Sequence, residues 1–318
     1  MGKTLVLVLA LGFTAQNVVT ASAQTYPIKP IRVSTTQAGG GNDFVTRLVA
    51  TAFLANTGQQ LVVDNRPSDI ISAEVVAAAP ADGYSILSAS NTVWVSSLIE
   101  KVPYDPVRDF APIILITSTP NVLVVHPSLP VNSVNDLIAL AKAHPAQINY
   151  ASAATGSSSH LAAELFKAAA GVNMVRIPYK GGAQALVPLV AGDVQVMFSV
   201  PTPAMPFIKS GKLRALAVTS ARPSELLPGL PTVAASGAPG YEQQNMNGWF
   251  APARTPESVI TRLNQEVARI LGMPDVKKRL FDGGAEVIGG SPKAFAEIIR
   301  SDLAQVGKVL NQAGVNRN

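Results

Sequence analysis

The sequence predicts an α/β fold built as two lobes that face one another. Short apolar runs typical of buried strands alternate with helical segments along most of the chain, and a glycine- or serine-rich turn follows one strand in each half. Each turn leads into a helix, whose N-terminus offers N–H groups and a partial positive charge that suit an anion. The sequence therefore predicts a clamp that holds a small acid between two lobes.

The first turn is the run Ala38-Gly39-Gly40-Gly41-Asn42-Asp43. It follows a strand-like run at residues 30–33 and leads into residues 44–50, where apolar side chains fall at helical spacing. Glycine lets the backbone turn tightly and approach a bound group closely, because no Cβ is in the way. We therefore expect the ligand to meet Gly39, Gly40, Gly41, Asn42 and Asp43. Asp43 is expected to cap the helix or hold a bridging water, because its carboxylate would repel an acid.

The first lobe continues with the same alternation. The expected elements are a helix to about residue 56, strands at 61–64 and 84–87, a helix at 72–79, and apolar strands at 113–116 and 122–125. Ligands of such sheets lie beyond the carboxyl ends of the strands. The loop after residue 87 therefore adds Ser88, Ser90 and Asn91 to the expected site. Trp94, placed in the same loop, is either an aromatic wall of the site or a packing residue.

The second lobe repeats the pattern. The run Ala151-Ser152-Ala153-Ala154-Thr155-Gly156-Ser157-Ser158-Ser159 follows a strand at 148–151 and opens a helix at 160–170. We expect Ala154, Thr155, Gly156, Ser157 and Ser158 to meet the ligand, with at least one serine capping the helix. Ser199, which follows a strand at 194–198, completes the expected site. His160, at the start of the helix, is expected to be structural.

Two passages between the lobes set the expected domain boundaries. The outward passage is placed near residues 122–125 and the return at Trp249-Phe250-Ala251-Pro252. The first domain is then residues 24–123 and 248–318, and the second is residues 124–247. Helices at 256–271, 275–281 and 291–312 and a small strand at 286–288 complete the first domain.

The N-terminus reads as a cleavable secretory signal over residues 1–23. Lys3 precedes an apolar stretch, and Ala21-Ser22-Ala23 forms a cleavage site, so the mature chain is expected to begin at Gln24. The apolar stretch is too short to span a membrane. Because the chain has no cysteine, it has no lipoprotein anchor, disulfide or thiolate metal site. These features predict a soluble protein of the bacterial periplasm.

Composition narrows the range of partners. The chain is 47% apolar and 14% charged, which is typical of a well-buried globular protein. Its formal net charge of +5 comes from scattered basic residues, and aromatic residues do not alternate with the run Lys277-Lys278-Arg279. Nucleic acid is therefore a poor candidate partner, and the mild positive excess favours an anionic ligand.

Several short motifs also follow one another in a recognisable order. They include Asp64-Asn65-Arg66-Pro67, Pro80-Ala81-Asp82-Gly83-Tyr84, Pro103-Tyr104-Asp105-Pro106, Pro178-Tyr179-Lys180-Gly181 and Gly211-Lys212-Leu213-Arg214-Ala215. With them, essentially the whole mature chain closely resembles the Bug family, the TctC-like substrate-binding proteins of tripartite tricarboxylate transporters. The resemblance implies the periplasmic-binding-protein (Venus flytrap) fold, with two α/β domains joined by two crossing strands. It also implies a small carboxylate ligand, gripped by loop N–H groups, hydroxyls and water, and delivery to the membrane subunits of such a transporter. We expect a monomer.

Departures from the family pattern bear on the ligand. A short run, Ser68-Asp69-Ile70-Ile71-Ser72, stands where relatives usually carry a glycine-rich loop, and Ser199 stands where an acidic residue is frequent. Because such an acid would pair with a ligand amine, its absence argues against an amino-acid ligand. Aliphatic dicarboxylates, tricarboxylates and aromatic acids all stay open.

The alternatives to a transport protein differ in class. The spacing Gly39-x-Gly41-x-x-Phe44, with Asp64 after it, imitates a dinucleotide site but lacks the third small residue, so a dinucleotide-dependent oxidoreductase is a remote alternative. A hydrolase would need an activated nucleophile, and no Gly-x-Ser-x-Gly elbow occurs. We therefore expect no catalytic residue, no metal and no cofactor. A ligand sensor that passes its closed form to a membrane signalling protein stays open, because transport and sensing use the same closed shape.

Overall fold

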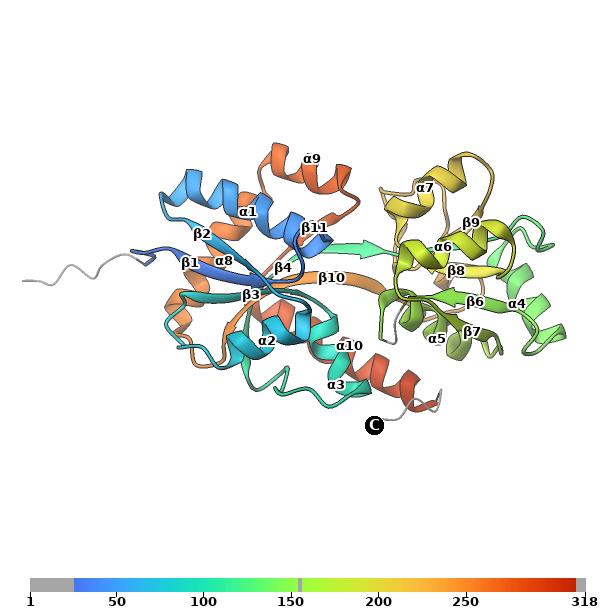
Figure 1. Ribbon diagram of the computed structural model, residues 1–318, viewed down its shortest axis with the longest axis horizontal. Helices are drawn as coiled ribbons and strands as arrows, with labels where there is room; N and C mark the ends of the chain where they lie inside the picture. The colour runs from blue at the N-terminus through green and yellow to red at the C-terminus, as the bar shows by residue number, and fades with distance from the viewer. Residues whose placement is uncertain (1–25, 154–155, 313–318) are drawn as a thin grey trace, which may run out of the picture.

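The computed structural model describes residues 26–153 and 156–312, which form two α/β lobes placed end to end (Figure 1). The signal over residues 1–23, Ala154 and Thr155 lie outside the described residues. Within the described ranges, no helix combines the length and the apolar character needed to cross a membrane.

The first lobe is organised on a mixed sheet with the strand order β11-β4-β10-β3-β1-β2. Its strands are β1 (Ile31–Thr35), β2 (Leu61–Asn65), β3 (Ser85–Ser90), β4 (Phe110–Pro120), β10 (Gln244–Pro252) and β11 (Glu286–Gly289). β1 is parallel to β2 and β3, and β10 is antiparallel to both β3 and β4. As a result, the carboxyl ends of β1 to β4 all lie at the side of the sheet from which the chain passes to the second lobe.

Helices cover both faces of this sheet (Figure 1). One face carries α1 (Gly41–Thr57), α8 (Glu257–Leu271) and α9 (Pro274–Asp282), and the other carries α2 (Asp69–Ala77), α3 (Thr92–Ile99) and α10 (Pro292–Gln312). Neighbouring residues of β10 pack into the hydrophobic cores on the two faces of the sheet, because successive side chains of a strand point to opposite faces. Trp249 packs with Ile31 and Leu263 on the α1 side, whereas Phe250 packs with Phe295 on the α10 side.

The second lobe has its own sheet, in the order β7-β6-β8-β5-β9. Its strands are β5 (Val122–Val125), β6 (Asn149–Ser152), β7 (Val175–Pro178), β8 (Val196–Ser199) and β9 (Arg214–Val218). Its helices are α4 (Val134–Ala143), α5 (Ser158–Ala170), α6 (Gly182–Ala191) and α7 (Pro201–Lys209), with the short 3-10 helix η1 (Ala234–Ser236). Phe166 of α5 packs with Phe198 of β8 in the core on one face, and Leu186 of α6 packs with Met197 in the core on the other.

The chain passes between the lobes at Asn121 and at Gln243. The outward passage, expected near residues 122–125, lies directly before them at Asn121, because β5 pairs only within the second sheet. The return strand β10 begins at Gln244, well before Trp249. Thr219 ties the two passages together, because its Oγ1 accepts from the Asn121 N–H at 2.7 Å and its carbonyl accepts from the Gln243 N–H at 2.9 Å.

The segment after residue 87 differs most from expectation. Ser88 and Ser90 belong to β3, and α3 follows where the sequence predicts a loop. Trp94 lies in α3 and is buried, donating from Nε1 to Asp302 at 2.6 Å and packing edge-on against Phe295. The hypothesis of an aromatic wall at Trp94 is therefore wrong, and the packing interpretation is confirmed.

Candidate functional site

A cavity of about 330 Å³ lies between the two lobes. It is lined by Thr36, Gly41, Asn42, Asp69, Ser90, Asn91, Thr92 and Asn245 from the first lobe and by Gly156, Ser157, Ser158 and Leu161 from the second. Four of these residues, Gly41, Asp69, Thr92 and Ser158, are the first residues of α1, α2, α3 and α5. The first N–H groups of a helix have no partner within it, and the helix dipole favours negative charge there. The described residues of the cavity therefore offer donors from both lobes to an anion.

The turn before α1 depends on its glycines and on Asp43. Gly39 adopts a left-handed φ of 82°, which favours glycine, and Gly40 stands at the N-cap without a side-chain cap. The Asp43 carboxylate accepts from the Gly39 N–H at 2.9 Å, from Arg47 Nε at 2.9 Å and from Asn65 Nδ2 at 2.7 Å. Burial alone would raise the pKa of Asp43, but these hydrogen bonds lower it below its ordinary value. Asp43 therefore holds the turn and stays ionised, and it does not line the cavity.

Asp69 is a lining residue that sequence reasoning missed. The Ser68 side chain caps α2 by accepting from the Ile71 N–H at 3.3 Å, so the helix begins at Asp69 rather than at Ser72. The Asp69 carboxylate accepts from Asn42 Nδ2 at 3.1 Å and from the Ser90 hydroxyl at 2.5 Å. Burial raises the pKa of Asp69 to about 6, against the opposing effect of the hydrogen bonds from Ser90 and Asn42.

The second lobe contributes the start of α5. The Ser157 side chain caps the helix by accepting from the His160 N–H at 3.4 Å, as one of the serines was expected to do. His160 Nδ1 in turn accepts from the Gly156 N–H at 3.1 Å. Burial, followed by the nearby Arg176, lowers the pKa of His160 to about 4, so its ring is neutral and can accept this hydrogen bond. His160 therefore has the structural role that was expected of it.

The expected site residues separate into two groups. Those that line the cavity are Gly41, Asn42, Ser90, Asn91, Gly156, Ser157 and Ser158. Those that do not line it are Gly39, Gly40, Asp43, Ser88 and Ser199. Ser88 is buried and accepts from the Thr46 hydroxyl at 2.7 Å, and Ser199 donates to the carbonyl of Val200 at 3.0 Å. Both hydroxyls therefore serve the fold around the cavity.

The charged side chains of the cavity lining bear on how a carboxylate could be held there. Asp69 is the one ionisable side chain, and no lysine or arginine is among the lining residues that the structure describes. The remaining polar side chains of the described lining are hydroxyls and amides, and the Asn91 amide is already engaged, because its Nδ2 donates to the Gln244 carbonyl at 3.1 Å. Attraction for an anion must therefore come from helix N-termini and neutral donors rather than from an ion pair.

A larger hollow of about 920 Å³ lies between the loop after β9 and the α9–β11 region. Charges of both signs line it: Arg222, Lys277 and Lys278 with Glu225, Glu242 and Glu286. None of its described lining residues begins a helix, and none follows β1, β2 or β3 directly. The smaller cavity, where strand ends and helix starts converge, is therefore the candidate ligand site.

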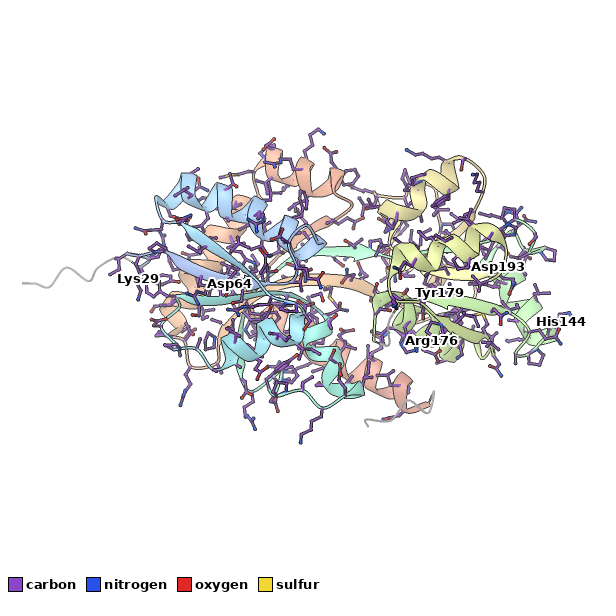
Figure 2. All side chains as sticks on the ribbon, in the orientation of Figure 1. Lys29, Asp64, His144, Arg176, Tyr179 and Asp193 are labelled. Atoms are coloured by element: carbon purple, nitrogen blue, oxygen red, sulfur yellow. The ribbon has the colours of Figure 1, made fainter. Side chains whose placement is uncertain are left out.

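His144 lies at the outer end of the second lobe, and Asp193 lies elsewhere in the same lobe (Figure 2). Asp64, which the dinucleotide hypothesis used, lies in the first lobe and forms an ion pair with Arg66 at 2.7 Å. These residues belong to the fold and not to the cavity lining.

Comparison with known proteins agrees with this architecture. The pattern of the TctC family, described as the tripartite tricarboxylate transporter family receptor, matches residues 45–315. The UPF0065 protein of the tcbD-tcbE intergenic region from a Pseudomonas species is 36% identical over 315 residues, which cover 98% of this chain and 94% of that protein.

Solved structures extend the comparison. A protein of R. palustris with adipate has a TM-score of 0.78 at 36% identity, covering 92% of this chain and 100% of that one. The periplasmic binding protein BugD has a TM-score of 0.74 at 32% identity, with 92% and 100% covered. MatC from Rhodopseudomonas palustris, with bound malate, has a TM-score of 0.73 at 28% identity, with 90% and 100% covered.

These similarities confirm several predictions from the sequence. The two-lobed α/β architecture is that of the neighbouring periplasmic binding proteins, and the expectation of a binding protein rather than an enzyme is confirmed by the same relatives. Sequence, fold and relatives agree over nearly the whole chain: it belongs to the TctC family, the receptors of tripartite tricarboxylate transporters.

Proposed function

We propose that the chain is a periplasmic solute-binding protein that captures a small carboxylate between its lobes and delivers it to the membrane subunits of a tripartite tricarboxylate-type transporter. The observation that carries this proposal is the convergence of four helix N-termini, from both lobes, on one cavity. The adipate and malate in the structures of two relatives support the choice of a carboxylate.

Binding and closure are one event in this proposal. The two domains are taken as the parts of the chain on either side of Asn121 and Gln243, where the passages lie. An acid that meets Gly41 and Thr92 from one lobe and Ser158 from the other gains donors only when the lobes are together. The ligand favours the closed form by as much as it binds that form better than the open one.

The proposal includes export and oligomeric state. The signal is removed after Ala23, the mature chain begins at Gln24, and it acts as a monomer. Intact mass of the protein recovered from a bacterial periplasm tests the cleavage position, and size-exclusion chromatography with light scattering tests the monomer. A mass that retains residues 1–23 would contradict the export step.

The decisive experiment is a thermal-shift panel on the mature protein, residues 24–318. The panel contains adipate, malate, citrate and benzoate, so that it covers aliphatic dicarboxylates, a tricarboxylate and an aromatic acid. A ligand that binds only the folded form stabilises it by about 2.7 kcal/mol at a hundred times its Kd, which gives a clear rise in melting temperature. If no acid raises the melting temperature, and none binds by calorimetry, the proposed function is wrong. Uptake of the binding acid by cells that carry the transporter, with and without this chain, then tests delivery.

A further inference from the structure

Asp69 poses a problem that the proposed function leaves unsolved. It lines the cavity with only 7% of its surface exposed, and its described hydrogen-bond donors, Asn42 and Ser90, are neutral. An arriving carboxylate therefore meets a buried acid and no compensating side-chain cation among the described lining residues.

The elements packed against α2 bring no cation to Asp69. They are β1, β3, α3 and β10. β3, α3 and β10 contain no lysine, arginine, histidine or acid. The end of β1 that contacts α2 is marked by Thr35, whose carbonyl accepts from the Ser72 hydroxyl. Arg32 lies toward the other end of β1 and is exposed. On α2 itself, Glu74 is exposed. Burial and then the nearby Asp69 raise the pKa of Tyr104, whose hydroxyl donates to the Val93 carbonyl at 3.0 Å.

Two ionised carboxylates that lie side by side in such a buried site repel each other strongly. When two carboxyl groups lie side by side, repulsion raises the pKa of one of them so that the pair holds a proton. Asp69 is already disposed to hold a proton, because burial raises its pKa to about 6 even though the hydrogen bonds from Ser90 and Asn42 act in the opposite direction. Asp43 cannot take the role, because its hydrogen bonds with Arg47 and Asn65 lower its pKa.

We propose that Asp69 is a specificity-determining residue that meets the ligand through a shared proton. This inference rests on the proposed carboxylate-binding function. The proton comes from solvent and lies between one Asp69 oxygen and one ligand oxygen, while the rest of the ligand charge faces the helix N-termini. A fully ionised diacid therefore binds with the net uptake of one proton. The favoured class of substrate is a diacid, one carboxyl of which meets Asp69 in this way.

Isothermal titration calorimetry measures this proton directly. The probes are succinate, glutarate and adipate, which carry no hydroxyl or amine of their own. Titrations at about pH 8, where both diacid carboxyls and Asp69 are ionised before binding, are repeated in two buffers of different ionisation enthalpy. The mature wild-type protein is expected to take up about one proton for each diacid bound. Its affinity is expected to fall about tenfold for each pH unit above about 6.

Two variants separate Asp69 from other acids. D69N removes the charge and keeps the shape, so its proton uptake is expected to be close to zero and its affinity to change little with pH. D302N is the matched control, because Asp302 is also an acid whose pKa is raised by burial, but it does not line the cavity and instead accepts from Trp94 and from the Asn91 side chain behind it. Its asparagine can still accept from the Trp94 N–H, and its proton uptake should equal that of the wild type.

The outcomes distinguish this inference from the proposed function. Diacid binding by the wild type without proton uptake overturns the inference alone, whether or not the variants fold. Unchanged uptake in a folded D69N variant also overturns it. Absence of binding by any of these diacids, and by the acids of the thermal-shift panel, overturns the proposed function and this inference with it.

Discussion

Replacing Gly41 with valine tests whether the cavity is the ligand site. Gly41 is the first residue of α1, it lines the cavity, and an added Cβ meets no heavy atom within 4 Å. Its φ is not in the left-handed region, so a side chain is tolerated by the backbone. G41V therefore introduces three carbon atoms beside the first N–H groups of α1 without disturbing the packed interior.

The size of the effect follows from the space that is lost. Extra carbon atoms in a well-packed site typically cost about 1–3 kcal/mol, which corresponds to a roughly 5- to 150-fold weaker binding of the acid. Stability should not fall, because valine has a higher helix propensity than glycine. The ligand-free melting temperature of G41V is therefore expected to equal or exceed that of the wild type.

The assay compares G41V with a matched control. Gly182 is the first residue of α6, an added Cβ there also meets nothing within 4 Å, and it does not line the cavity. Affinity for the acid that gives the largest thermal shift is measured by calorimetry for the wild type, G41V and G182V. G182V should bind like the wild type. Wild-type affinity in G41V, with the fold intact, would refute the assignment of this cavity.

Three further changes test the site and its surroundings. S157A should lower stability by about 0.5–2 kcal/mol through the lost helix cap and should also weaken acid binding, whereas S133A, which removes the equivalent cap of α4, should lower stability alone; equal affinities in the two variants would contradict a contact at Ser157. L161A should destabilise the fold by about 2–5 kcal/mol in urea unfolding, because Leu161 belongs to the second lobe but is buried in a first-lobe core; a cost near zero would show that this contact is not maintained in solution. D69N should change the pH dependence of stability: the pKa of Asp69 is raised from 3.8 to about 6 on folding, so wild-type stability relative to D69N should fall by about 3 kcal/mol as the pH rises from about 4 to about 6, and then level off. Parallel pH profiles of melting temperature in wild type and D69N would exclude that shift.

The parts of the fold that were predictable have strong local signals. The turn at Gly39 and the start of α1 were predictable because a strand-like run, three glycines and a helical period follow one another within a few residues. Ser157 was predictable as a cap because serines precede a periodic apolar segment. Relatives of known fold then agree with the two-lobed arrangement that these signals predict.

The parts that were missed depend on tertiary contacts. α3 is eight residues long and mostly apolar, so it has no polar face to reveal a helical period, and its burial against α10 decides its conformation. Asp69 was missed as a lining residue because, although Ser68 is a favoured N-cap residue, the position of Asp69 beside Asn42 and Ser90 depends on the packing of α2 against β3. Asn245 reaches the cavity only because β10 extends along β4 as far as Pro120. The position of Asn245 could be predicted only from the pairing of β4 and β10, which are far apart in the sequence.

The hydrogen bonds of Thr219 have a consequence for the size of acid that fits. Both connecting segments are held by the same residue, at Asn121 and at Gln243, so a change in the angle between the lobes must keep these three residues together or break the two hydrogen bonds. In the proposed binding mechanism, the length of the acid then sets how closely α1 and α5 approach each other across this tied connection.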